Sequence, residues 1–223
     1  MQIKKVSVPV LFILSAVILP SIILPSIAAS QWERVKSSNA IEVFVRPVSG
    51  SAIKEFKAVT EVQGSISSIL ALLDDTGSYT RWMYRCSEAK ILYKKNDYER
   101  ITYNVTSSPW PVDDRDIAVK SVISQDKKTA VVTITLTGLP EYIPVNSKKV
   151  RMTKLNGYWM IEPLGNGRLR VTYRAHSELG GSVPETLVNI ALVDIPYNTL
   201  YNFKKMVNQS PYKDAKYDAI IEK

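Results

Sequence analysis

"SPWPVDDRDIAV", residues Ser108–Val119, joins a rigid turn to the start of an apolar strand. Pro109 and Pro111 flank Trp110, and each proline ring holds its φ angle at about −65°. Arg115 is the one cation of this stretch and stands among three aspartates. The pattern predicts a fixed backbone turn that directs Arg115 from the mouth of the strand that follows.

Most of the chain shows the two-residue alternation that is typical of strands. In the stretch after Thr129, for example, Val132, Ile134 and Leu136 share one side and threonines occupy the other. Asn156-Gly157 predicts a tight turn. The sequence therefore predicts an antiparallel sheet with one apolar face and one solvated face. The predicted strands are Ile41–Arg46, Ile53–Val62, Ala89–Lys94, Tyr98–Val105, Ile117–Ser124, Ala130–Gly138 and Arg168–His176.

Two segments have helical spacing. The segment Ser65–Asp75 places an apolar residue every three or four positions, which predicts a short helix. A second, longer helix is predicted over Val183–Val207, with Ser182 and Glu185 as a capping box and Pro196 as a kink. A curved antiparallel sheet that closes on one long C-terminal helix is an α+β architecture.

The first thirty residues have the pattern of a secretory signal peptide. Lys4 and Lys5 precede an apolar stretch, 6–27, that ends in small residues. Cleavage after Ala28 or Ser30 fits the small-residue rule, and an uncleaved membrane anchor is the alternative. We therefore expect residues 1–30 to be removed on export.

The remaining chain is expected to form one domain over residues 31–207, followed by a polar tail over residues 208–223. Cys86 is its one cysteine, so an exported product has no internal disulfide and depends on packing for its stability. These features favour the bacterial periplasm over a disulfide-rich extracellular setting.

The charge stays basic after the predicted cleavage. The whole chain has a net charge of +8, and loss of Lys4 and Lys5 leaves 27 cations against 21 acids, a net of +6. Such a surface is attracted to anionic membranes or acidic partners. Nucleic acid is not expected as a partner, because no basic run with interleaved aromatics and no zinc-finger spacing occurs. The sequence indicates no particular protein partner.

The stretch Ser108–Val119 closely resembles the proline-tryptophan-proline segment, ending in aspartate-arginine-aspartate, of START domains. These are the lipid-transfer domains related to the steroidogenic acute regulatory protein. Other landmarks follow in the expected order, and the resemblance covers about Trp32 to Val207. They are "GSAIKEFKAV" (50–59), "YTRWMYRCSEAKIL" (79–92), "NGYWMIEPL" (156–164) and "SELGGSVPETLVN" (177–189).

The resemblance implies a helix-grip fold, in which a bent sheet wraps round the C-terminal helix and encloses a tunnel for one hydrophobic molecule, such as a sterol or phospholipid. It also implies that Glu88 and Arg115 form an ion pair in the cavity, which gives the apolar tunnel one hydrogen-bonding point for a ligand. A pair that merely pins two strands is the alternative. Asp116 is expected to brace Arg115, and Asp113 and Asp114 to be solvated.

The apolar lining is expected to come from inward strand faces and from the C-terminal helix, with plain core packing as the alternative for each residue. The candidates are Tyr103, Trp159, Tyr173, Leu187, Ile190 and Ala191.

Gating is expected at residues 124–129, at residues 140–149 and at the helix near Pro196. The lysines of the first two segments, which could meet anionic headgroups or simply be solvated, are Lys127, Lys128, Lys148 and Lys149.

The sequence offers little for catalysis. His176 is the one histidine and falls on the polar side of its strand, and neither a nucleophile elbow nor a metalloprotease motif is present. No cofactor or metal is expected. The leading interpretation is a non-enzymatic envelope carrier of a single lipid. A helix-grip enzyme of the cyclase or hydratase type and a lipid sensor or presenting subunit are the alternatives.

Overall fold

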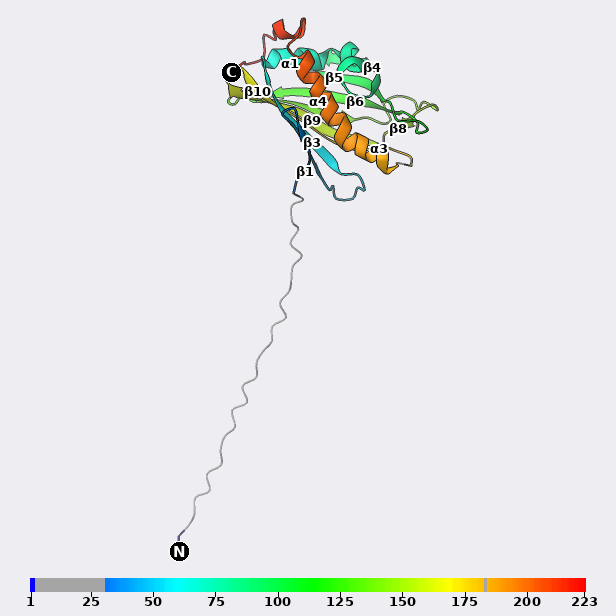
Figure 1. Cartoon of the computed structure of the whole chain (residues 1–223), viewed down its shortest axis with the longest axis vertical. Helices are drawn as coiled ribbons and strands as arrows, with labels where there is room; N and C mark the ends of the chain where they lie inside the picture. Colours follow the sequence, from blue (N-terminus) through cyan, green and yellow to red (C-terminus); the bar gives the residue numbers. More distant parts are fainter. Residues whose placement is uncertain (3–30, 183) are drawn as a thin grey trace.

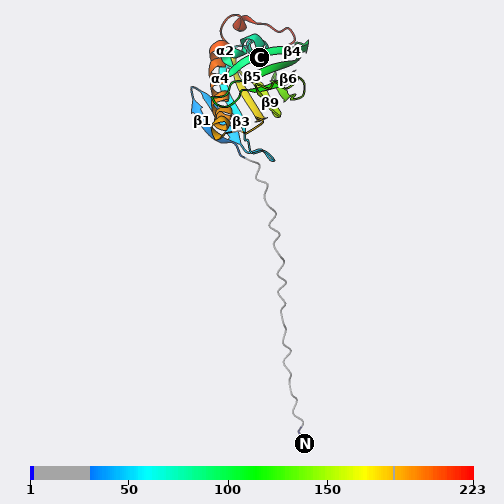
Figure 2. The same cartoon turned by 90° about the vertical axis from the view of Figure 1, so that its right-hand side faces the viewer.

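A curved antiparallel sheet wraps round a C-terminal helix, as the sequence predicts (Figures 1 and 2). The computed structural model describes residues 1–2, 31–182 and 184–223, so nearly all of the predicted signal peptide lies outside the described residues. Among the described residues, no helix is both long enough and apolar enough to cross a bilayer. The predicted α+β helix-grip architecture is confirmed.

The strands form one ten-stranded sheet in the order β1-β2-β3-β10-β9-β7-β6-β5-β4, with the short β8 paired to β6. The strands are β1 (Glu33–Ser38), β2 (Ile41–Arg46), β3 (Glu55–Gln63), β4 (Cys86–Asn96), β5 (Glu99–Thr106), β6 (Arg115–Gln125), β7 (Val132–Gly138), β8 (Val150–Arg151), β9 (Lys154–Gly165) and β10 (Arg168–Glu178). The helical elements are α1 (Ile66–Asp74), η1 (Thr76–Ser78), α2 (Tyr79–Trp82), α3 (Glu185–Asn189), η2 (Ile190–Asp194), α4 (Ile195–Met206) and η3 (Tyr212–Asp214).

Cross-strand pairing carries one apolar layer across the middle of the sheet. Tyr173 on β10 stands opposite Trp159 on β9 and opposite Ala58 on β3. Trp159 in turn pairs with Ile134 on β7, so the alternation predicted for that strand faces the core. All four side chains are at least nine-tenths buried. The inner face of the sheet is therefore apolar across β3, β10, β9 and β7.

The C-terminal helix is continuous from Glu185 to Met206 but changes its pitch midway. The predicted capping box is wrong, because Pro184 is the N-cap residue and no side chain caps this end. The five residues of η2 form a wider π-type turn in which the Ile195 N–H donates to the Ile190 carbonyl. Pro196, which lacks an N–H, follows directly, so the wide turn absorbs the proline where the sequence predicts a kink.

Parts of the segment 208–223, which the sequence predicts as a polar tail, dock on the domain. The Glu222 carboxylate accepts hydrogen bonds of 2.8 Å from the backbone N–H groups of Ile66 and Ser67, the first two residues of α1. Tyr212 is buried, and its hydroxyl donates to the Asp75 carboxylate at 2.6 Å. The Ser65 side chain already caps α1 by accepting from the Ser68 N–H, and the tail adds acceptors and a negative charge at the same end, where the first turn has no acidic residue.

The predicted turn at Asn156-Gly157 is also wrong, because β9 runs straight through it. Gly157 lies in mid-sheet between Ala175 on β10 and Leu136 on β7. A Cβ atom there would overlap the Arg174 carbonyl oxygen and the Ala175 side chain. The glycine therefore serves close backbone packing and not a change of direction.

We expect Gly157→Ala to lower the free energy of unfolding by about 1–3 kcal/mol, because the added methyl group forces the two strands apart. Thermal or urea unfolding measures the loss. Gly77→Ala is the control, because its nearest new contact is an ordinary 3.5 Å to Asp75 Oδ1. An unchanged midpoint for Gly157→Ala would contradict the close packing.

Candidate functional site

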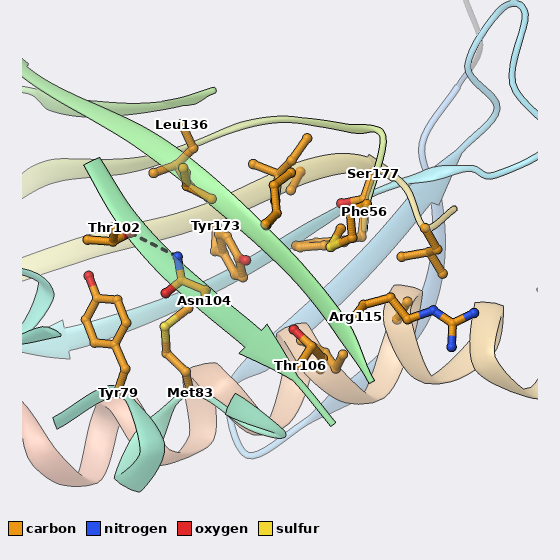
Figure 3. Close-up of a pocket in the computed structure, with 18 of the residues that line it drawn as sticks. Phe56, Tyr79, Met83, Thr102, Asn104, Thr106, Arg115, Leu136, Tyr173 and Ser177 are labelled. Atoms are coloured by element: carbon orange, nitrogen blue, oxygen red, sulfur yellow. Dashed lines mark hydrogen bonds between the residues drawn. The ribbon is translucent and has the colours of Figure 1, made fainter. Parts of the chain in front are cut away.

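A cavity of about 160 Å³ lies between the inner face of the sheet and the C-terminal helix. Figure 3 shows Arg115 at one end of it and Tyr79 and Thr102 at the other. Leu187 and Ala191 contribute the helical wall. Most of the lining is apolar, so the space suits a hydrophobic guest with a few polar contacts.

The floor of the cavity is aromatic. The rings of Trp159 and Tyr173 stack at 4.1 Å between centroids, and Phe56 meets Tyr173 edge-on at 5.0 Å. Burial raises the pKa of Tyr173 to about 12, so its hydroxyl stays neutral and can donate a hydrogen bond at neutral pH. These packed rings give the cavity a rigid apolar wall.

Arg115 is a buried cation at the end of the cavity, with 3% of the residue exposed. Its Nη atoms donate to the carbonyl oxygens of Asp113 and Ser182, at 2.5 Å and 3.3 Å, and to the Ser108 hydroxyl at 3.4 Å. Its Nε has no hydrogen-bond partner among the described residues. Burial lowers the pKa of Arg115, and the charges of Asp113 and Asp114 oppose that shift. The guanidinium is thus held by neutral carbonyl and hydroxyl oxygens and keeps an unused donor.

The predicted ion pair between Glu88 and Arg115 is not formed. Glu88 instead lies 3.0 Å from Lys90 Nζ on the edge strand β4, with 43% of its side chain exposed. The strand register explains this difference, because Glu88 stands opposite Val105, which stands opposite Asp116. Glu88 therefore lies on the face of the sheet opposite to the one that Arg115 occupies.

The sequence predicts that Asp116 braces Arg115, and this prediction is wrong. Asp116 faces the outer side of the sheet. Its carboxylate accepts hydrogen bonds from Arg151 Nε at 2.9 Å, from Arg151 Nη2 at 3.0 Å and from the Tyr103 hydroxyl at 2.9 Å. Arg151 also donates to the carbonyl oxygens of Pro140, Ile143 and Pro144. This cluster fixes the loop 139–149 over β6.

The structure gathers many but not all of the predicted lining residues. Those that line the cavity are Arg115, Trp159, Tyr173, Leu187 and Ala191. Glu88, Tyr103 and Ile190 lie outside it. Tyr103 is buried in a separate patch on the outer face, where its hydroxyl bonds Asp116.

Sequence reasoning missed a row of polar residues on the cavity side of β5. Thr102, Asn104 and Thr106 all line the cavity, together with Ser121 of β6. They alternate with the apolar Ile101, Tyr103 and Val105. The alternation was a visible signal, but the apolar side of β5 is not the side that faces the cavity.

The predicted gating loops lie at opposite ends of β6. Lys148 and Lys149 precede β8, whose Val150 pairs with Arg115 at the cavity end. Lys127 and Lys128 follow the far end of this eleven-residue strand, about 33 Å away along the strand.

The reactive side chains that the sequence contains lie away from the cavity lining. His176 Nε2 lies 3.1 Å from Ser51 Oγ and 3.2 Å from the Ile53 carbonyl oxygen, on the outer face. Burial raises the pKa of the Cys86 thiol to about 11, so it is not a thiolate at neutral pH. Within residues 31–182 and 184–223, no group of three or more histidine, cysteine or acidic side chains is placed to hold a metal ion.

We expect Asp116→Asn to destabilise the protein by about 3 kcal/mol at neutral pH, because it leaves the Arg151 charge without its partner. Burial alone raises the pKa of Asp116, but hydrogen bonds from Arg151 and Tyr103 outweigh it and lower the pKa below its ordinary value. The ionised carboxylate therefore contributes stability above pH of about 4, which is lost as the pH falls through the lowered pKa.

Urea unfolding of both proteins between neutral pH and about pH 3 measures this contribution. The difference in free energy between wild type and Asp116→Asn should shrink as the pH falls. A difference that stays constant with pH would contradict the buried ionised pair.

Comparison with known proteins agrees with this geometry. The family model for the START domain matches residues 24–211. An uncharacterized protein of Pseudomonas aeruginosa is 34% identical over 172 residues, which cover 77% of this chain and 84% of the relative.

Among solved structures, a STAR-related lipid transfer protein fragment from Xanthomonas axonopodis is 29% identical, with a TM-score of 0.73 over 80% of this chain and 99% of the other. Human StAR-related lipid transfer protein 5 shares the fold, with a TM-score of 0.72 at 17% identity over 82% of this chain and 88% of that one. The chain belongs to the START-domain family.

Proposed function

We propose that this protein is a non-enzymatic lipid carrier of the bacterial envelope, which holds one amphipathic lipid in the cavity and exchanges it with membranes. Membership of the START family supports lipid binding in general. The envelope location is supported by the predicted signal peptide, by the single Cys86 and by the basic charge of the chain.

The buried Arg115 guanidinium at the end of an apolar cavity is the observation that carries this proposal. Desolvation of an ion costs several kcal/mol, and the carbonyl partners of Arg115 offset it only in part. A lipid headgroup with an acceptor oxygen would pair with the unused Nε, while its apolar chain lies against Trp159 and Tyr173. One lipid then satisfies both parts of the site.

The size of the cavity implies that it enlarges when it is loaded. Its volume of about 160 Å³ is below the roughly 300–1,000 Å³ that is typical of ligand pockets. The wall formed by Leu187, Ala191 and Ile195 is the one suited to move, since it spans the wide turn η2 and the proline that follows. The wide turn and the proline interrupt the regular hydrogen bonds of this helix, whereas the strands of the sheet are held by continuous hydrogen-bonded pairing.

The loops near Arg115 offer a membrane contact. Trp110 is 92% exposed, on a turn fixed by the prolines on either side of it. Val145 is 71% exposed on the loop that Arg151 holds, and on the same loop Lys148 is exposed and Lys149 is half-buried. Tryptophan favours the membrane interface, and lysines are attracted to anionic headgroups. Docking by these loops would bring the Arg115 end of the cavity to the lipid surface.

A carrier without catalysis is favoured over a helix-grip enzyme by the placement of the acid–base groups. In such an enzyme Glu88, Arg115 or His176 would do the acid–base work, but Glu88 and His176 lie on the outer face of the sheet. Arg115 lines the cavity, but its guanidinium is a hydrogen-bond donor that stays protonated and is a poor general acid or base. A sensor or presenting subunit differs from a carrier in what it does with a bound lipid, so a transfer assay separates the two.

We expect Arg115→Met to reduce the rate and extent of lipid transfer between donor and acceptor vesicles by about tenfold or more, because it removes charged hydrogen bonds to the headgroup. The free energy of unfolding should change little, because the buried charge disappears with its desolvation cost. Lys120→Met is the matched control, since Lys120 faces outward on the same strand and pairs with Glu99.

Transfer by Arg115→Met at the wild-type rate would contradict the headgroup role. Lipid that is bound but never delivered by the wild-type protein would favour a sensor or presenting subunit instead.

We expect Trp110→Ala to weaken binding to anionic vesicles severalfold, because a largely exposed indole ring is lost from the membrane contact. Vesicle flotation at low and high salt measures binding and its electrostatic part. Tyr98→Ala is the control, since Tyr98 is exposed at the β4–β5 turn, away from Arg115. Equal binding by wild type and Trp110→Ala would exclude this docking mode.

A further inference from the structure

One wall of the cavity is polar along its length. Thr102, Asn104 and Thr106 project inward from β5, and Ser121 projects inward from β6. Figure 3 shows Thr102 joined to Asn104 on the side of the pocket away from Arg115. The facing wall holds Tyr173 and other apolar side chains. The cavity is therefore amphipathic in cross-section.

The hydrogen bonds of this polar wall are incomplete. Asn104 Nδ2 donates to Thr102 Oγ1 at 2.9 Å, and among the described residues Asn104 Oδ1 has no partner. The hydroxyl groups of Thr106 and Ser121 likewise have no partner within that part of the chain. Ser121 is 8% exposed, and Asn104 and Thr106 are half-buried. Burial of a polar group without a partner costs about 1–3 kcal/mol, so a wall of this kind favours a guest with matching polar atoms.

The two polar regions require different partners. Arg115 is a donor only, so it requires an acceptor such as a carboxylate or phosphate oxygen. Asn104 requires a group on the guest that bonds its free amide atom, and a hydroxyl can do so whichever way the amide is turned, because it both donates and accepts.

The sheet register sets the order of these two contacts. Thr106 stands directly opposite Arg115, and Asn104 lies two residues farther along β5 on the same face. Two residues of strand span about 7 Å. A guest whose acidic end meets Arg115 therefore passes Asn104 with a later part of its chain.

We propose that the ligand is an acidic amphiphile with a hydroxyl group on its chain, such as a hydroxylated fatty acid. The acidic head bonds Arg115, the hydroxyl bonds Asn104, and the remaining chain lies against Trp159 and Tyr173. This assignment rests on the proposed lipid-binding function and narrows it to a chemical class.

Competition against a bound fluorescent fatty acid tests the assignment with purified full-length protein. The competitors are hexadecanoic acid, its analogues with a hydroxyl near the carboxylate or near mid-chain, and hexadecyl phosphate. We expect at least one hydroxylated acid to bind about tenfold tighter than hexadecanoic acid, the gain of about one well-placed hydrogen bond in a buried site. Comparison of hexadecyl phosphate with hexadecanoic acid shows whether Arg115 binds a phosphate or a carboxylate headgroup more tightly.

Two variants separate the contacts. Asn104→Leu keeps the volume of the side chain and should abolish the preference for the hydroxylated acid while hexadecanoic acid still binds. Arg115→Met should weaken all the acids alike and keep the preference. Thermal unfolding confirms that each variant is folded.

Equal binding of hydroxylated and plain acids by the wild-type protein would overturn this inference while leaving lipid binding intact. Retention of the preference by folded Asn104→Leu would also overturn it. Failure of the probe and of every acid to bind would count against the proposed function itself.

Discussion

The alternation of side chains along β6 is the constraint on which the rest of the site depends. Arg115 and Asp116 are neighbours in the chain, and a strand sends them to opposite faces of the sheet. Asp116 meets Arg151 and Tyr103 on the outer face, and this cluster holds the loop 139–149. Arg115 is left on the inner face with neutral partners, two carbonyl oxygens and the Ser108 hydroxyl, and with an unused donor. The Asp116–Arg151 ion pair on the outer face thus helps to position Arg115 on the inner face, where the hydrogen bonds of its guanidinium are incomplete.

The cavity likewise combines a closely packed part with a part whose hydrogen bonds are incomplete. The rings of Trp159 and Tyr173 are closely stacked, whereas Asn104 and its neighbours on β5 keep unused hydrogen-bonding atoms. The wall opposite the sheet is the weakest, because η2 and Pro196 interrupt its regular helical bonding. A stiff sheet with one softer helical wall is a suitable frame for a site that must load and release a guest.

Most of the fold could be predicted from the sequence, because the inner side of β7 and β10 is apolar at every second residue. That pattern correctly places Trp159 and Tyr173 in the cavity wall. It failed at Tyr103, because β5 is buried on both faces and its more apolar side lies outside the cavity. It also failed at Gly157, where close strand packing and a tight turn both call for glycine. The Glu88 partner depended on strand register, which alternation along a single strand does not determine.

The most direct test of the account is native mass spectrometry of the protein isolated from its own cells under mild conditions. The account predicts one bound lipid per protein chain. It also predicts that the released lipid has a headgroup with a hydrogen-bond acceptor oxygen and one apolar chain. Protein that is free of lipid, and that stays free after incubation with lipid extract, would contradict the central claim that this cavity is a lipid site.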